Sequence, residues 1–256
     1  MKLIEQFAIQ LYSVRDIINN DFTGTLKKLA EMGYTGVEFA GYGKLSDREM
    51  KSALTANSLK PVGAHIGIES LTKRLDEEIA YHKILGTEYL ICPFFDMKTG
   101  EDALKLAEIL KPVIAKCGEA GFKFAYHNHA HEFAAHEHAA HEHAQDGGEY
   151  LLDILFKNLP PEAAMELDIY WAAYAGVEPL AYMEKNRDRL KLLHIKQIDK
   201  DKKCVDLDQG ILDFRKIITR AKTLGAEHFI LEQEEYAVSS IVSVKNDIDY
   251  IFKLEE

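Results

Sequence analysis

The chain has 256 residues, of which 47% are apolar, so it is long enough to bury one large core. Its 31 Lys and Arg residues against 42 Asp and Glu residues give a formal net charge of -11, which argues against binding to the phosphate backbone of nucleic acids. No apolar run approaches the roughly 20 residues that a membrane-spanning helix needs, and the N-terminus lacks the pattern of a signal peptide. Cys92, Cys117 and Cys204 are widely spaced, as in proteins of a reducing compartment. We therefore expect a cytoplasmic protein that acts on small molecules.

Strand and helix patterns alternate along the chain. Apolar runs typical of strands occupy residues 7–14, 36–40, 61–66, 89–95, 123–129, 164–170, 190–196 and 228–233. Segments with helical spacing occupy residues 24–32, 46–58, 71–85, 101–120, 148–157, 179–186, 213–224 and 239–254. Pro112 is expected to kink or break the fourth of these helices.

The alternation predicts a fold of the α/β class. Eight strands and eight helices in units of about 30 residues predict a single (β/α)8 TIM-barrel domain over residues 1–256. Several strands are nearly continuous apolar runs, which is typical of parallel strands buried on both faces. An open doubly wound sheet is the alternative, but the Gly-rich phosphate turn typical of that fold does not follow Val14.

One segment interrupts the alternation. Residues 130–144 consist of three tandem five-residue units, AHEFA, AHEHA and AHEHA, within a His-rich low-complexity insertion at 130–147. Because it follows the fifth strand, a barrel would place it at the C-terminal mouth. The segment is either a lip or lid that attracts metal ions, or a tolerated, solvated loop expansion.

Four side chains that can bind metal come late in consecutive strands. In a barrel, the C-terminal ends of the strands share one mouth, so these side chains are expected to meet. They are His127, Asp168, His194 and Glu232. Two imidazoles and two carboxylates suit Mn²⁺, Co²⁺, Zn²⁺ or Fe²⁺ better than Ca²⁺. The sequence therefore predicts one divalent metal ion of one of these kinds.

Five further residues near strand ends are candidates for contact with a substrate. Glu38 is a candidate acid or base, and His65 is placed to polarise a carbonyl. His129 lies on the same strand face as His127, because residues two apart on a strand point the same way. It is a candidate for proton transfer or for orienting a ligand. Lys196 would suit a developing oxyanion and Trp171 a sugar ring, although each also fits a purely structural role.

Several motifs taken together resemble a known family. They are QLYSVRD, GVEFAG, AHIG, YHNHAHEF, ELDIYWA, LHIKQID and LEQE, and they span the chain. The chain is similar to the xylose-isomerase-like TIM-barrel superfamily, and within it to the sugar phosphate isomerase/epimerase branch. The resemblance implies a divalent metal held by Glu, Asp, His and Glu, with Asp168, His194 and Glu232 at the last three positions. His127 stands where a Glu is usual, and Gln197 stands where the branch often has an Asp.

The combined features predict a metal-dependent isomerase or epimerase that moves a proton next to the carbonyl of a sugar or keto-sugar. Glu232 is the first candidate for the base, and Glu38 or a histidine for the second proton. The same enediolate can expel a substituent, which would make the protein a lyase of keto-glycosides. Other classes are an abasic-site endonuclease and a non-catalytic sugar- or metal-binding barrel. No phosphate cradle is apparent, and a homo-oligomer is compatible with the sequence.

Overall fold

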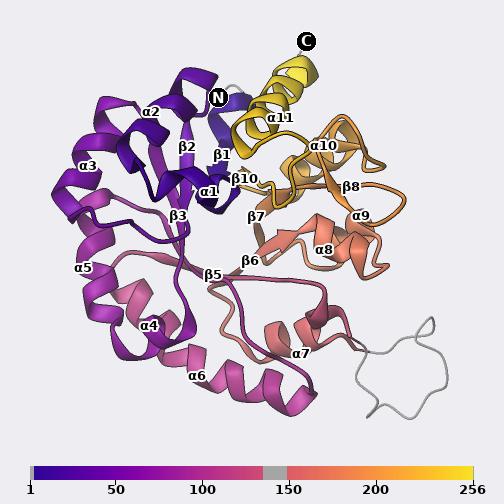
Figure 1. Ribbon diagram of the computed structural model, residues 1–256. Helices are drawn as coiled ribbons and strands as arrows, with labels where there is room; N and C mark the ends of the chain where they lie inside the picture. Colours follow the sequence, from indigo (N-terminus) through magenta and orange to yellow (C-terminus); the bar gives the residue numbers. More distant parts are fainter. Residues whose placement is uncertain (1–2, 135–148, 256) are drawn as a thin grey trace.

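The computed structural model describes residues 3–134 and 149–255. Its centre is a closed barrel in which the strands follow the order β1-β10-β7-β6-β5-β4-β3-β2 (Figure 1). Because β1 pairs with both β2 and β10, all in parallel, the predicted TIM barrel is confirmed and the open sheet is wrong. The barrel strands are β1 (Phe7–Gln10), β2 (Gly36–Phe39), β3 (Lys60–His65), β4 (Tyr89–Cys92), β5 (Lys123–His127), β6 (Ala163–Asp168), β7 (Leu190–Ile195) and β10 (His228–Leu231).

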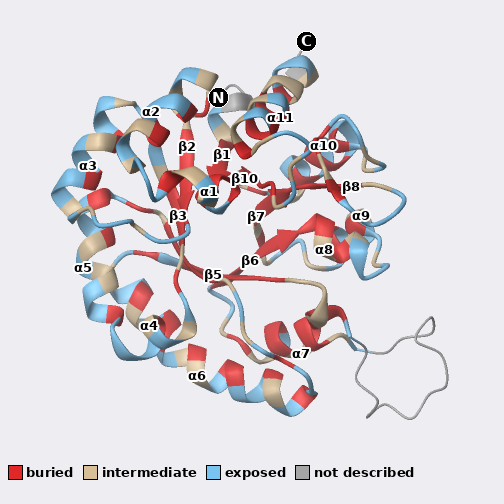
Figure 2. Ribbon diagram, in the orientation of Figure 1, coloured by how far each residue is buried: buried red, intermediate tan, exposed pale blue. Residues whose placement is uncertain are grey.

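Helices surround the barrel and turn their buried faces toward it (Figure 2). The main ones are α2 (Phe22–Met32), α3 (Asp47–Ala56), α5 (Leu75–Leu85), α6 (Gly100–Glu119), α7 (Leu151–Asn158), α9 (Pro179–Lys185), α10 (Phe214–Leu224) and α11 (Ser240–Glu255). Shorter elements are α1 (Arg15–Ile18), α4 (Ile68–Lys73), α8 (Ile169–Tyr174), the 3-10 turns η1 (Leu3–Gln6), η2 (Leu11–Val14) and η3 (His131–Phe133), and the hairpin of β8 (Gln197–Ile198) and β9 (Cys204–Val205). In the described part of the chain, no helix has both the length and the apolar character needed to span a bilayer.

Local sequence signals set several helix ends. Ser46 and Glu49 form a capping box at the start of α3, in which each side chain accepts a hydrogen bond from the other residue's backbone N–H. Gly33, which ends α2, adopts a φ of 107°, a left-handed conformation that glycine reaches without strain. The expected kink or break at Pro112 does not interrupt α6, which is helical from Gly100 to Glu119 with Pro112 on its exposed side.

The predicted strands run too far at their C-terminal ends. The strand predicted at 7–14 stops at Gln10 and continues as the 3-10 turn η2. The strand predicted at 164–170 stops at Asp168, and α8 begins there. The Asp168 side chain causes this change, because its Oδ1 accepts a hydrogen bond from the Trp171 backbone N–H at 3.0 Å and caps the helix.

The barrel interior is layered. One set of inward side chains forms an apolar cluster: Ala8, Val62, Tyr89, Ile91, Ala125, Ala164, Leu192 and Ile230. Inward side chains on a strand are two residues apart. The next inward layer toward the mouth therefore holds the residues two positions after those of the apolar cluster. On five strands that next position is polar and buried: Gln10, His127, Glu166, His194 and Glu232. We call these residues, with Glu38 on β2 and His65 on β3, the polar layer.

The first unit of the His-rich repeat is part of the packed structure. Glu132 and Phe133 are buried within η3. Glu132 accepts hydrogen bonds from the Tyr126 hydroxyl and the His129 backbone N–H, both at 2.9 Å. Residues 135–148, which hold the other two units and the predicted lip or lid, lie outside the described residues.

Candidate active site

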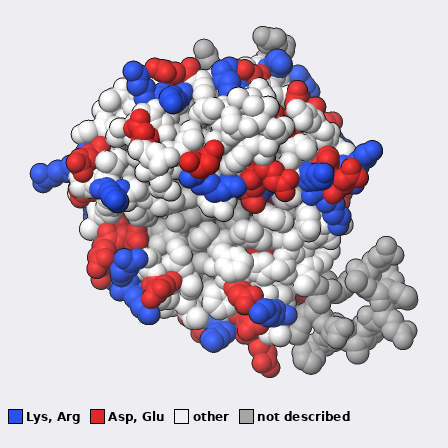
Figure 3. Space-filling model, viewed as in Figure 1, with Lys and Arg blue, Asp and Glu red and all other residues white. Residues whose placement is uncertain are grey.

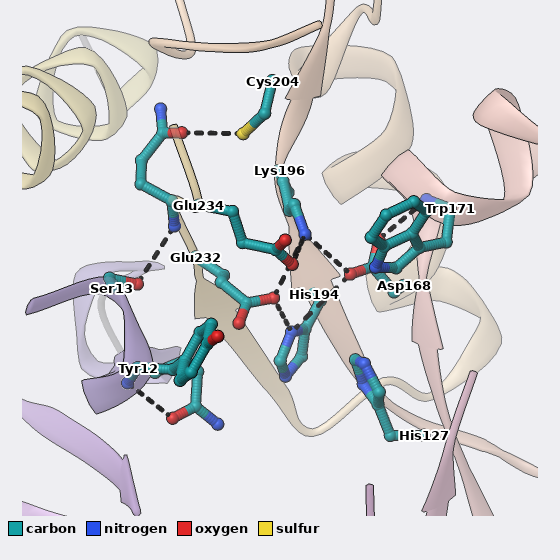
Figure 4. A network of polar contacts seen from close by, with 12 residues as sticks. Tyr12, Ser13, His127, Asp168, Trp171, His194, Lys196, Cys204, Glu232 and Glu234 are labelled. Carbon is teal, nitrogen blue, oxygen red and sulfur yellow. Dashed lines mark hydrogen bonds and ion pairs between the residues drawn. The ribbon is translucent and has the colours of Figure 1, made fainter. Parts of the chain in front are cut away.

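Three of the four predicted metal ligands meet at one point of the barrel mouth (Figure 4). His194 Nδ1 lies 3.1 Å from Glu232 Oε2 and 3.9 Å from Asp168 Oδ2. The barrel order explains the meeting, because β6, β7 and β10 are neighbours and Asp168 is in register with His194. All three side chains are buried.

The fourth predicted ligand, His127, belongs to an overlapping group. Its ring centroid is 4.5 Å from that of His194, and its Nδ1 is 3.2 Å from Glu166 Oε2. The same Glu166 oxygen lies 2.8 Å from His65 Nε2 and 3.5 Å from His194 Nε2. His65, His127, Glu166 and His194 can therefore approach a common cation, as can Asp168, His194 and Glu232.

Glu166 is a site residue that the sequence prediction missed. It lies two residues before Asp168 on β6, so both carboxylates point into the barrel. It is also in register with His127 on β5. The sequence does contain a clue to Glu166. Alternate residues of a strand share a face, so Ala164, Glu166 and Asp168 all point the same way.

Asn128 is a second residue that the prediction missed. Its Oδ1 accepts a hydrogen bond from the Asp168 backbone N–H at 3.0 Å, and its Nδ2 donates to the Asp168 carbonyl at 3.3 Å. The three residues of the His-Asn-His sequence therefore have different positions. His127 belongs to the polar layer, buried Asn128 is hydrogen-bonded to the end of β6, and His129 faces the pocket described below.

Lys196 was expected to contact a developing oxyanion. Its side chain is fully buried and lies beside the carboxylates. Its Nζ pairs with Glu234 and lies 3.6 Å from Glu232 Oε2 and 3.8 Å from Asp168 Oδ2. It also lies 4.8 Å from the centre of the Trp171 ring, in cation–π contact. Lys196 therefore compensates the charge of the carboxylates and does not line the pocket.

Burial and neighbouring charges set the protonation of the site. Burial alone would raise the pKa of Glu232, but the charges of Lys196 and His194 hold that pKa well below its usual range. Burial raises the pKa of Asp168, and the charges of Lys196 and His194 offset this rise only in part. Burial lowers the pKa of His127, and the charge of His194 adds to this effect. Glu232 is therefore an ionised acceptor, and His127 is a neutral imidazole able to bind a metal.

The buried donor atoms fit a divalent cation. Asp168 Oδ2 makes no hydrogen bond to any described residue, since its neighbours Lys196 and His194 are 3.8 Å and 3.9 Å away. A buried carboxylate oxygen left in this state is costly unless a cation completes it. On the other side of the imidazole, His194 Nε2 lies 2.9 Å from Glu38 Oε1, a contact that fixes the ring and directs Nδ1 toward Asp168 and Glu232.

A pocket of about 370 Å³ opens above these groups. The residues lining it are Tyr12, Ala40, His65, Pro93, Phe94, His127, His129, Trp171, Glu232 and Glu234. His65, His129 and Trp171 line this pocket, and their predicted roles, substrate binding for His65 and Trp171 and catalysis for His129, stay predictions. Glu38 does not line the pocket, because it is fully buried beneath His65 and His194. A larger groove of about 900 Å³ between α9 and α10 contains no residue of the polar layer.

The comparison with known proteins agrees with this arrangement. The family model described as the xylose isomerase-like TIM barrel matches residues 26–253. The chain belongs to this family. No curated protein matches the sequence. Two solved structures named as sugar phosphate isomerase/epimerase from Parabacteroides distasonis superpose with TM-scores of 0.83. Their identities are 24% and 26%, over 96% of this chain and 92% and 97% of theirs.

A more distant relative shares the fold of this xylose isomerase-like barrel. The IOLI protein, whose crystal structure holds a zinc atom, superposes with a TM-score of 0.74 at 12% identity over 98% of both chains. In the present chain, His127 stands at the strand end where the family motif has a Glu. A carboxylate is nevertheless close, because Glu166 Oε2 on the adjacent strand lies 3.2 Å from His127 Nδ1.

Proposed function

We propose that this protein is a divalent-metal-dependent isomerase or epimerase that moves a proton next to the carbonyl of a sugar or keto-sugar. The observation that carries the proposal is the convergence of Asp168 Oδ2, His194 Nδ1 and Glu232 Oε2 at a pocket large enough for a sugar ring. The names of the Parabacteroides distasonis neighbours support the same reaction class.

Asp168, His194 and Glu232 would hold the cation, with His127 beside them. A bound divalent cation would polarise the substrate carbonyl and stabilise the negative charge of an enediolate. Glu38 keeps the His194 ring oriented through the 2.9 Å contact to Nε2. Asn128 fixes the backbone of Asp168 from the other side.

Glu232 is the proposed base. It is the carboxylate of the ligand group that also lines the pocket, and its low pKa keeps it ionised. Lys196, 3.6 Å away, stabilises the ionised form. Removal of a positioned acid or base costs about 10²- to 10⁴-fold in rate.

His65 is the proposed donor of the second proton. It lines the pocket on β3, which β1 and β2 separate from the strand of Glu232. Its Nε2 lies 2.8 Å from Glu166 and 3.1 Å from Glu38. Burial alone lowers the pKa of His65, but these two carboxylates raise it to about 10, so the ring carries a proton. Glu38 then acts through His65 and not on the substrate.

The position of reprotonation decides the product. Return of the proton to the same carbon gives an epimer, and return to the neighbouring carbon gives an isomer. If the enediolate instead expels a substituent, the reaction is that of a lyase of keto-glycosides. Product analysis by NMR distinguishes the three outcomes.

Deuterium exchange in heavy water across a panel of keto-sugars tests the proposal, because it detects C–H proton transfer without knowledge of the product. We expect stoichiometric metal by elemental analysis, and loss of both metal and exchange in Asp168→Ala. Asp153→Ala is a matched control, since this buried acid pairs with Tyr182 and Lys185 away from the polar layer.

The His-rich repeat requires a separate control, because histidines there would bind metal in any variant. Metal content is therefore measured in a background in which His136, His138, His141 and His143 are replaced by Gln. Metal that persists after Asp168→Ala in this background, or exchange that does not depend on metal, would contradict the proposed function.

A further inference from the structure

The outer part of the pocket differs in chemistry from its floor. His65, His127 and Glu232 form the floor, whereas the mouth is lined by Tyr12 and Phe94, whose side chains are 45% and 48% exposed. We propose that the substrate is an uncharged sugar whose non-reacting end packs against Tyr12 and Phe94, and not a sugar phosphate. This inference rests on the proposed function for the choice of the reacting end.

Among the described residues, the pocket lining offers a phosphate no Lys or Arg side chain, and the protonated His65 is already paired with Glu166 and Glu38. The ten lining residues include no Lys or Arg, and their two carboxylates are Glu232 on the floor and Glu234 near the mouth. Phosphate sites in proteins rely on Arg, Lys or clustered backbone N–H groups. A phosphate group at the outer end of a substrate would instead meet apolar rings and the carboxylate of Glu234.

Two cationic side chains near the pocket, Lys196 and Arg15, already have partners. Lys196 is buried and faces Glu234, Glu232 and Asp168. Arg15 donates to the Tyr12 carbonyl at 3.0 Å, to the Glu234 carbonyl at 2.7 Å and to the Tyr236 hydroxyl. Lys196 would have to leave these carboxylates to bind a phosphate, and three of the five N–H donors of Arg15 are already used, which opposes the binding of a sugar phosphate.

The aromatic rings at the mouth are fixed without being covered. The Tyr12 ring lies under the Arg15 guanidinium at 4.3 Å, and the Tyr12 backbone N–H donates to Gln10 Oε1 at 3.0 Å. The Phe94 ring lies edge-on to His129, with centroids 5.5 Å apart. Exposed aromatic side chains held at a pocket rim are typical of ligand contact surfaces.

The surface around the hollow carries both uncharged and charged groups. On the face shown in Figure 3, uncharged atoms lie along one side of the hollow in the middle, and a row of Lys, Arg, Asp and Glu side chains lies along its other side. A phosphate at the mouth would exchange water for contact with the Tyr12 and Phe94 rings, which costs more for a charged group than for an uncharged one.

The chain provides its own reporter of pocket occupancy, because its single tryptophan, Trp171, lines the pocket. Trp171 fluorescence is titrated in the metal-loaded protein with fructose, fructose 6-phosphate and 6-O-benzylfructose, which carries an aromatic ring at the position of the phosphate. We expect fructose 6-phosphate to bind about 10-fold more weakly than fructose, and 6-O-benzylfructose about 10-fold more tightly. Tighter binding of the phosphorylated sugar, or no response to any of the three, overturns the inference.

Variants test the two parts of the inference separately. Tyr12→Ala and Phe94→Ala should each remove most of the gain shown by 6-O-benzylfructose. Val238→Ala, a control at an exposed apolar residue outside the pocket, should not. Glu234→Gln removes a negative charge and releases Lys196, so it should strengthen binding of fructose 6-phosphate. Unchanged affinities in all three pocket variants contradict the inference.

The result is separable from that of the deuterium exchange experiment. A preference for uncharged sugars without any proton exchange supports the binding mode and contradicts the proposed reaction. Exchange on a sugar phosphate combined with its tighter binding supports the reaction and contradicts the uncharged substrate.

Discussion

Replacement of Asn128 by alanine should weaken both the fold and the metal site, because this buried amide holds the backbone of Asp168. The change removes the acceptor of the Asp168 N–H at 3.0 Å and the donor to the Asp168 carbonyl at 3.3 Å. Each of these two buried backbone groups costs about 1–3 kcal/mol when it is left without a partner, so the loss should be about 2–6 kcal/mol in the free energy of unfolding.

The Asn128→Ala change should also lower the affinity for the metal. Groups that orient a ligand typically contribute 10- to 100-fold to metal affinity, and Asn128 positions Asp168 through its backbone. We therefore expect metal affinity in Asn128→Ala to fall by about 10- to 100-fold. Urea unfolding of the metal-free protein and direct metal titration measure the two effects independently.

Asn186→Ala is the matched control. The Asn186 side chain donates to the Tyr182 carbonyl at 3.0 Å at the end of α9, away from the polar layer. It should lower stability without changing metal affinity. If Asn128→Ala loses stability but binds metal as tightly as the wild type, Asp168 is held by other means and the reasoning is refuted.

Two further predictions concern His82 on α5 and Gly63 on β3, neither of which lines the pocket. Burial lowers the pKa of His82 from 6.5 to about 4, so the unfolded chain takes up the proton first as the pH falls. Stability should therefore drop between pH 6.5 and pH 4 by up to about 3 kcal/mol. In His82→Gln, urea unfolding across this range should lack that component, and an unchanged slope would contradict the argument. Gly63→Ala would place a Cβ 2.5 Å from Glu38 Oε2, so thermal unfolding should show a loss of about 1–3 kcal/mol. Gly118→Ala, with open space around its Cβ in an exposed helix position, should show a gain of up to about 1 kcal/mol; equal effects of the two changes would contradict the clash.

The sequence alone predicted the barrel, because the fold depends on local patterns repeated along the chain. Alternating apolar runs and amphipathic segments set the order of strands and helices, and caps such as Ser46 with Glu49 marked helix starts. The strand ends were less predictable. The helix after Asp168 depends on a hydrogen bond from the Trp171 N–H to the Asp168 side chain, which competes with continued strand pairing.

The candidate site was predictable only in part. Asp168, His194 and Glu232 could be expected to meet because each comes late in its strand, and parallel strands end at one mouth. The partners of these residues depend on register, which the sequence does not give. Glu166 faces His127 because β5 and β6 pair in that register, and Asn128 reaches Asp168 across the same pair of strands.

Burial was also decided by the tertiary structure. From the sequence, Glu38 and Lys196 were candidates for contact with the substrate. The structure places Glu38 beneath two histidines and Lys196 among three carboxylates, so neither side chain lines the pocket. The order of residues along the chain determined which side chains enter the barrel. Strand register and packing of the loops decided which of them reach the pocket, because these depend on contacts between residues far apart in the sequence.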